Sequence, residues 1–146
     1  KNKKVLFPAD LQAAHEETSE KIRIQEDSKK KVAFKESTDK IYGRPEYREE
    51  NLLIRAAQSP EELAKESAAL HHCVRTYVDC VARGECVILF IRKTASPDEP
   101  YFTLELSPKG EIIQCRGDRN CAYPEDVKEF LARWKKWMKK KERKAA

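Results

Sequence analysis

Four short apolar runs along the chain predict β-strands. They are NLLIRAA (residues 51–57), CVILFIR (86–92), YFTLELS (101–107) and EIIQCR (111–116). CVILFIR is apolar without alternation, which is typical of a central strand covered on both faces. YFTLELS alternates, so Phe102, Leu104 and Leu106 share one face. Short connections such as SPKG force antiparallel neighbours, and the pattern therefore predicts an antiparallel meander of three to four strands.

Helical patterns flank these strands. Ser59-Pro60-Glu61-Glu62 predicts a helix start, with Ser59 as N-cap, Pro60 at the first helical position and Glu62 completing a capping box. With a break near Ser67, a second helix then ends around Gly84. The last helix begins near Pro124. Its core face is predicted to consist of five apolar residues at positions i, i+3, i+4, i+7 and i+11: Val127, Phe130, Leu131, Trp134 and Met138.

The first 48 residues are predicted to form a charged helical arm that docks on the rest of the chain or on a region upstream of it. Leu11, His15, Thr18 and Ile22 give it a thin helical stripe, and SKKKVAFKEST (residues 28–38) reads as a break. Residues 49–146 are predicted to form one globular unit. The fold class is α+β: a helical arm, a helix pair, the antiparallel meander and a basic amphipathic C-terminal helix.

The composition agrees with one soluble domain. The 146 residues are 40% apolar and 38% charged, and no apolar run is long enough to span a membrane. The N-terminus lacks the apolar core of a secretory signal, and the first residue is not methionine, which is compatible with a fragment. Five cysteines, an odd number, favour a reducing compartment, so we expect the cytoplasm. No Walker, GxGxxG or GxSxG motif is present, and we expect no cofactor.

The net charge of +5 belongs to the end of the chain. From Tyr123 onward there are nine Lys or Arg against four Asp or Glu, and the rest of the chain is balanced. Basic patches of this kind bind phosphates, although Lys-rich terminal helices are also common solvated surfaces. The candidate nucleic-acid contacts are Arg116, Arg119, Lys135, Lys136, Lys139 and Lys140.

The segment LHHCVRTYVDCV, read as one helix from Leu70 to Val81, predicts which side chains are buried. At 100° per residue, Cys73 shares the apolar face with Leu70, Val74 and Val81. Cys73 is therefore predicted in the core rather than as a nucleophile, and His72 on the opposite side. A zinc site would have histidines and cysteines available, but the chain has no C-x2-C pair, and we predict no metal site.

Five polar residues are the candidate catalytic set: His72, Arg92, Glu105, Gln114 and Asn120. A carboxylate and an imidazole can divide the roles of general base and general acid, while arginines hold a phosphate. This combination suits metal-independent RNA cleavage with the ribose 2′-hydroxyl as nucleophile. A surface sheet with an ordinary cross-strand Glu–Arg pair would have the same sequence pattern, so both interpretations stay open.

The ordered set LHHCVRTY, VILFIRK, PYFTLEL, EIIQCRGDRN and VKEFLARW resembles the C-terminal region of PcfJ-like proteins of plasmids, phages and other mobile elements. PADLQAAHEE is similar to the segment upstream in that family. The resemblance places weight on eight residues: His72, Cys73, Tyr77, Arg92, Glu105, Gln114, Gly117 and Asn120. Ser67 and Arg75 stand where the family tends to have small residues, and these departures bear on the local turn and on access to His72.

Three functions follow as hypotheses. The first is a nucleic-acid-associated accessory domain of a mobile genetic element, which contacts DNA or RNA phosphates through sheet arginines and the Lys-rich helix. The second is a metal-independent nuclease or phosphotransferase that uses His72 and Glu105. The third is a protein-interaction module in which the helix bearing Trp134 and Trp137 docks a partner; no membrane contact is expected.

Overall fold

The computed structural model describes residue 25 and residues 27–145 of the chain. Five strands form one sheet, in the order β1 (Tyr47–Arg48), β2 (Leu52–Ala56), β3 (Val87–Lys93), β4 (Phe102–Leu106) and β5 (Ile112–Arg116). Every neighbouring pair is antiparallel, so the α+β class and the meander are confirmed. The sheet has one strand more than predicted, because the short β1 lies in a segment that reads as turns.

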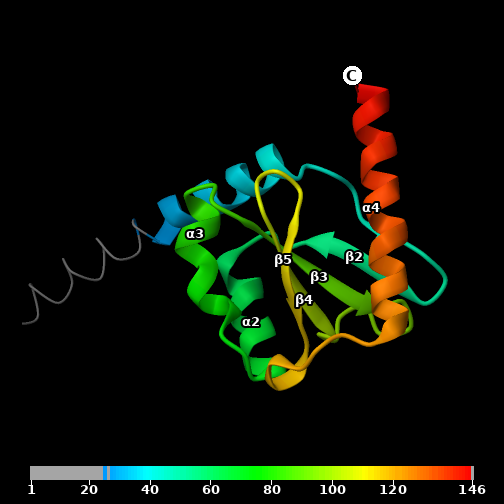
Figure 1. The fold of residues 1–146 in the computed structure, drawn as a ribbon. Coiled ribbons are helices and arrows are strands. Elements are labelled where there is room, and N and C mark those ends of the chain that lie inside the picture. Colours follow the sequence, from blue (N-terminus) through cyan, green and yellow to red (C-terminus); the bar gives the residue numbers. More distant parts are fainter. Residues whose placement is uncertain (1–24, 26, 146) are drawn as a thin grey trace, which may run out of the picture.

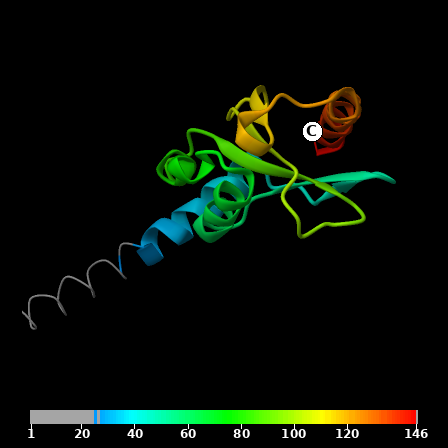
Figure 2. The ribbon, with the colours of Figure 1, turned by 90° about the horizontal axis from the view of Figure 1, so that it is seen from below.

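Helices surround this sheet. The leading helix covers residues 25 and 27–41, and it is followed by α2 (Pro60–Leu70), the 3-10 turn η1 (Val74–Tyr77), α3 (Val78–Ala82), the 3-10 turn η2 (Asp118–Asn120) and α4 (Glu125–Ala145). Figure 2 shows α4 on one side of the sheet and α2 with the leading helix on the other. The domain therefore has a helical layer on each side of the sheet.

Strand β3 is buried on both faces, as its unbroken apolar run predicts. Its alternate residues Leu89 and Ile91 pack in the core under α4, while Ile88 and Phe90 pack in the core with α2 and α3. All four side chains are at most 1% exposed. The central position of β3 follows from this double coverage, since a strand with no polar face must be covered twice.

The core face of α4 is confirmed at every predicted position. Val127, Phe130, Leu131, Trp134 and Met138 are all buried. The Trp134 indole N–H donates to the hydroxyl of Tyr42 over 3.1 Å, which satisfies the polar atom of an otherwise fully buried ring. Trp134 thus belongs to the core and is not available to dock a partner.

The leading helix corrects the prediction of a break at residues 28–38. Those residues are helical, because Phe34 is fully buried in the core beside Val81 and Phe90. Phe34 and Thr38 bury one face of a segment whose exposed side chains are largely charged, which the thin sequence pattern did not reveal. Residues 27–48 contribute Phe34, Tyr42 and strand β1 to the globular body; the stripe predicted from Leu11 to Ile22 lies outside the described residues.

The start of α2 is confirmed, but its hydrogen bonds differ from a capping box. Ser59 is the N-cap and its side chain makes no cap hydrogen bond. The Glu62 carboxylate instead accepts the N–H of Gln58 over 2.7 Å and a bond from Arg55 over 2.7 Å. Within the described part of the chain, no helix is long and apolar enough to cross a membrane.

Candidate functional site

A sharp turn after α2 places the first functional side chain. The helix ends at Leu70, and His71 adopts a left-handed conformation with φ of 53°. Ser67 organises the turn: its carbonyl accepts the N–H of His71 and of His72, and its hydroxyl accepts the N–H of Arg75 over 2.8 Å. The prediction of one helix from Leu70 to Val81 is therefore wrong, because His71 is left-handed and the N–H groups of His72 and Arg75 bond to Ser67 out of helical register.

This turn reverses two predicted orientations. Cys73 is exposed rather than buried, which corrects its assignment to the core. His72 is half-buried and points towards the sheet instead of away from it. Leu70, Val74 and Val81 are buried as predicted, since the 3-10 turn restores the inward face after the break. The serine at position 67 thus directs His72 into the body of the domain.

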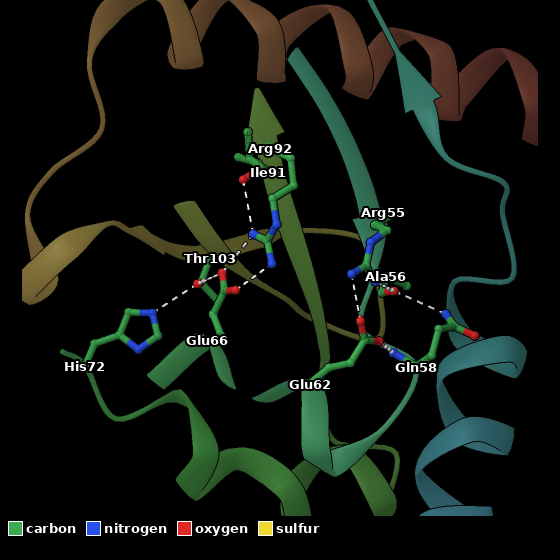
Figure 3. Close-up of polar contacts among 9 residues, drawn as sticks. All are labelled: Arg55, Ala56, Gln58, Glu62, Glu66, His72, Ile91, Arg92 and Thr103. Carbon is green, nitrogen blue, oxygen red and sulfur yellow. Dashed lines mark hydrogen bonds and ion pairs between the residues drawn. The ribbon is translucent and has the colours of Figure 1, made fainter. Parts of the chain in front are cut away.

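His72 contacts a chain of buried polar groups (Figure 3). Its Nε2 lies 3.0 Å from the Thr103 hydroxyl on β4. The Thr103 hydroxyl donates to the Glu66 carboxylate on α2 over 2.6 Å. Arg92 on β3 binds the same carboxylate through both terminal nitrogens, at 2.6 and 3.1 Å. The imidazole is therefore connected through one hydroxyl to a buried ion pair.

The ion pair keeps Glu66 charged. Glu66 and Arg92 are only 1% and 4% exposed. A carboxylate in such a place is stable as an anion only when it is paired and hydrogen-bonded, as it is here by the bidentate guanidinium and by Thr103. The Arg92 guanidinium also lies 4.6 Å from the centroid of the Phe90 ring, which adds a cation–π contact.

The direction of these bonds assigns the His72 tautomer. Thr103 has one hydroxyl hydrogen, and the anionic carboxylate of Glu66 takes it. The Thr103 oxygen can then only accept from His72, so Nε2 carries a hydrogen. In the neutral ring, the lone pair is on Nδ1, which lies 3.5 Å from the N–H of Val74. Protonation of the ring would place a second N–H on Nδ1.

Two residues that lie opposite each other on neighbouring strands complete the site. Glu105 on β4 is the register partner of Gln114 on β5. The Gln114 amide donates to Glu105 over 2.9 Å and to the Tyr77 hydroxyl over 3.0 Å. Among the residues that the structure describes, no ion pair is formed by Glu105. One carboxylate oxygen is therefore fixed by an amide.

These residues line a cleft of about 120 Å³ on the α2–α3 side of the sheet. Four of the five predicted catalytic residues contribute to it, namely His72, Glu105, Gln114 and Asn120, and Arg116 lines it too. A dry cavity of about 150 Å³ holds a benzene molecule, so this cleft admits a group of the size of a phosphate or a small ring. A whole nucleotide would extend out of it.

The other predicted residues lie elsewhere. Arg92 is behind His72 and does not line the cleft. Arg119 is exposed in η2, 3.8 Å from Asp118. Lys135, Lys136, Lys139 and Lys140 are exposed on α4, which covers the opposite side of the sheet (Figure 2). The predicted basic residues therefore divide between two surfaces.

A strained loop closes one end of the cleft. Arg119 and Asn120 have φ of 53° and 64°, and the Gly117 N–H donates to the Cys121 carbonyl over 3.0 Å. Asp118 lies 3.0 Å from His71 Nδ1, which joins this loop to the turn after α2. Position 117 requires glycine because a Cβ there would lie 2.6 Å from the Phe102 ring.

Glu66 is the site residue that the sequence interpretation missed. It is the second residue of the stripe Leu63, Glu66, Ser67 and Leu70, whose members are all buried. A buried carboxylate and a buried arginine each need a partner of opposite charge. A carboxylate on the buried stripe of one helix and an arginine in a doubly covered strand are therefore predicted to form an ion pair. That pattern was present in the sequence.

Three reactive groups line the cleft: the His72 imidazole, the Glu105 carboxylate and the exposed Cys73 thiol. Thr103 and Glu105 are two residues apart on one face of β4, so the imidazole that contacts Thr103 lies on the same side of the sheet as the Glu105 carboxylate. Burial raises the pKa of the Cys115 thiol to about 12, which makes it a poor nucleophile. No three His, Cys, Asp or Glu side chains of the described ranges could together hold a metal ion.

Comparison with known proteins agrees with the resemblance seen in the sequence motifs. The family model described as PcfJ-like protein matches residues 1–131. An uncharacterized protein of Listeria innocua is 27% identical over 139 residues, which cover 94% of this chain but 30% of the relative. The chain thus spans less than a third of that relative's length, and no solved structure matches it. The match over residues 1–131 shows that the chain belongs to the PcfJ-like protein family.

Proposed function

We propose that this domain binds nucleic acid as part of a larger protein of a mobile genetic element. In this proposal, the His72 cleft receives one phosphodiester group. The observation that carries it is the convergence of His72, Gln114, Arg116 and Asn120 on one small cleft. The five cysteines are free thiols, which agrees with a reducing compartment such as the cytoplasm.

The chemistry of the lining suits a phosphate. Arg116 is exposed at the end of β5, where its guanidinium can bind two phosphate oxygens. Asn120 adds a further hydrogen-bond donor, and the cleft is too small for a base and sugar together. Contacts of this kind to the backbone fix the position of a nucleic acid without reading its sequence.

A binding titration tests this proposal. Labelled RNA or DNA oligonucleotides should bind with an affinity that falls steeply with salt, since each neutralised phosphate releases counterions. Arg116→Gln should weaken binding, whereas Arg48→Gln, which removes an equally exposed arginine from the opposite edge strand, should not. The proposal fails if the wild type binds neither polymer at low salt, or if both variants bind alike.

A second candidate function is metal-independent cleavage of RNA at the same cleft. It is favoured by the chain from Arg92 through Glu66 and Thr103, which fixes the His72 ring in one orientation. Groups that hold an imidazole in this way are typical of acid–base sites. A histidine without a role in turnover would not need a chain of buried polar groups to hold its ring.

The reaction follows from the two walls of the cleft. Glu105 accepts the proton of the ribose 2′-hydroxyl as its oxygen forms a bond to phosphorus. The bond from phosphorus to the 5′-oxygen breaks, and protonated His72 gives a proton to that leaving oxygen. Arg116 stabilises the additional negative charge on the phosphoryl oxygens. The products are a 2′,3′-cyclic phosphate and a 5′-hydroxyl end.

Cleavage assays in the presence of EDTA test the second candidate. RNA should be cut and DNA of the same sequence should not, because DNA lacks the 2′-hydroxyl. Glu105→Gln should slow cleavage by about 10²- to 10⁴-fold, the usual contribution of a general base. Glu99→Gln removes an exposed carboxylate from the connection between β3 and β4, which does not line the cleft, and it should leave the rate unchanged. Equal rates for both variants would exclude Glu105 as the base.

A further inference from the structure

Two grooves on the α4 side of the sheet share a single lysine. The first has a volume of about 330 Å³ and lies between α4 and the β4–β5 turn, with Arg44, Lys109, Lys135 and Lys139 in its lining. Glu111 is the acidic residue that lines it. The second has about 180 Å³ and lies beside it, lined by Tyr123, Lys128 and again Lys135. Lys135 therefore connects the two into one continuous basic surface.

The lysines of α4 divide by helical phase. Lys128, Lys135 and Lys139 are spaced at i, i+7 and i+11, which places them on one side of the helix, towards the grooves. Lys136 and Lys140 are equally exposed but line neither groove. A polymer lying in the grooves would meet the first set and not the second.

Tyr123 gives this surface an aromatic platform. Its side chain is 39% exposed, an unusual state for a large ring next to a core helix. Proteins that bind single-stranded nucleic acid combine a positive groove along the backbone with aromatic rings on which bases stack. A duplex hides the faces of its bases, so an exposed ring beside lysines favours a single strand.

The position of Tyr123 relates the grooves to the cleft. Tyr123 follows Asn120 by three residues, and Asn120 lines the His72 cleft. The segment from Asn120 to Tyr123 therefore runs from the cleft to the grooves. β5, the outermost strand of the sheet, lies between the two surfaces.

We propose that the two grooves form a track for single-stranded nucleic acid. The strand lies along Lys139, Lys135 and Lys128, stacks one base on Tyr123, and reaches the His72 cleft past Asn120. This inference rests on the proposed function and names its substrate class. It also predicts that Lys109, at the tip of the β4–β5 turn, contacts the nucleic acid. The sequence pattern did not single out this lysine.

The test compares two double variants of one helix by fluorescence anisotropy with a labelled single-stranded oligonucleotide. Lys135→Gln with Lys139→Gln should weaken binding and lower the salt slope by about 1.4, since each contact to a single strand contributes about 0.7. Lys136→Gln with Lys140→Gln removes the same charge from the same helix and should change neither. Equal losses for the two pairs would overturn the track, because the helix would then act only through its net charge.

Tyr123 supplies an independent measurement. Tyr123→Ala should weaken single-strand binding by roughly 5- to 150-fold, the usual contribution of one stacked base, whereas Tyr123→Phe keeps the ring and should bind normally. A duplex that binds as tightly as the single strand would overturn the track. If the wild type binds and Arg116→Gln weakens it, while the groove variants have no effect, only the track fails; if the wild type binds nothing, the proposed function fails.

Discussion

Replacing Glu66 by leucine leaves the Arg92 guanidinium without its carboxylate in a site that excludes water. Arg92 is 4% exposed, and apart from Glu66 its guanidinium donates to the Ile91 carbonyl over 3.3 Å. Removing one partner of a buried ion pair costs about 3–5 kcal/mol, because the remaining charge stays buried. This is a large share of the roughly 5–15 kcal/mol by which a domain is stable. Glu66→Leu should therefore bring the domain close to unfolding.

The double variant Glu66→Leu with Arg92→Met should behave in the opposite way. Replacing a buried ion pair by apolar groups of similar volume is commonly neutral or stabilising, so the second substitution should recover most of the loss. Urea unfolding measures the difference. With an m-value of about 2 kcal/mol per molar, the single variant should lower the midpoint by about 1.5–2.5 M. A loss below about 1 kcal/mol, or a double variant as unstable as the single one, would refute the account of the pair.

The same double variant tests whether the pair positions His72. Once the carboxylate is gone, the Thr103 hydroxyl can donate to His72 Nε2 instead of accepting from it. The ring should then move its hydrogen to Nδ1, which the chemical shifts of its two nitrogens report directly. The wild type should show the Nε2–H form. An unchanged tautomer in the folded double variant would mean that Glu66 does not control the ring.

Three further predictions concern stability and reactivity. Burial alone would raise the pKa of Glu62, but the hydrogen bonds that its carboxylate accepts outweigh burial and lower the pKa. A carboxyl with a lowered pKa loses its stabilising contribution as the pH falls. Glu62→Gln should therefore flatten the decrease in urea midpoint between pH 5 and pH 3. Burial raises the pKa of Cys86 and of Cys115 to about 12, so at pH 8 a thiol reagent should modify the two exposed cysteines rapidly and these two only on unfolding. Gly117→Ala should lower stability by about 1–3 kcal/mol in the same urea assay, because the added methyl group overlaps the Phe102 ring.

The strands and the last helix could be predicted because each is specified by burial along its own length. The unbroken run of β3 and the spacing of apolar residues in α4 both survive in the structure. The leading helix could not be predicted in the same way. Its helical state depends on contacts with residues far along the chain: Phe34 and Thr38 are buried, and the Ser37 hydroxyl donates to the Ala82 carbonyl. Local periodicity does not report such a contact.

Because of the turn at His71, helical periodicity could not predict which way the side chains of the site point. Helical phase predicts the buried side of residues 70–81 only if the helix is continuous, and the left-handed His71 interrupts it. Glycine normally signals such a residue, and here histidine takes its place. The sequence therefore identified His72, Glu105, Gln114 and Asn120 as candidates by residue type, while the orientation of His72 depended on hydrogen bonds to Ser67.

The location of the strain favours a functional interpretation of the cleft over a surface pair. In the part of the chain that the structure describes, three non-glycine residues have positive φ: His71, Arg119 and Asn120. All three lie in the two segments that the His71–Asp118 contact joins, and these segments carry His72 and Asn120 into the cleft. A left-handed residue other than glycine costs about 1–2 kcal/mol, which glycine would avoid at each position. A fold selected for stability alone would have glycine at these three positions. The side chains found there are therefore more readily explained by a function of the cleft.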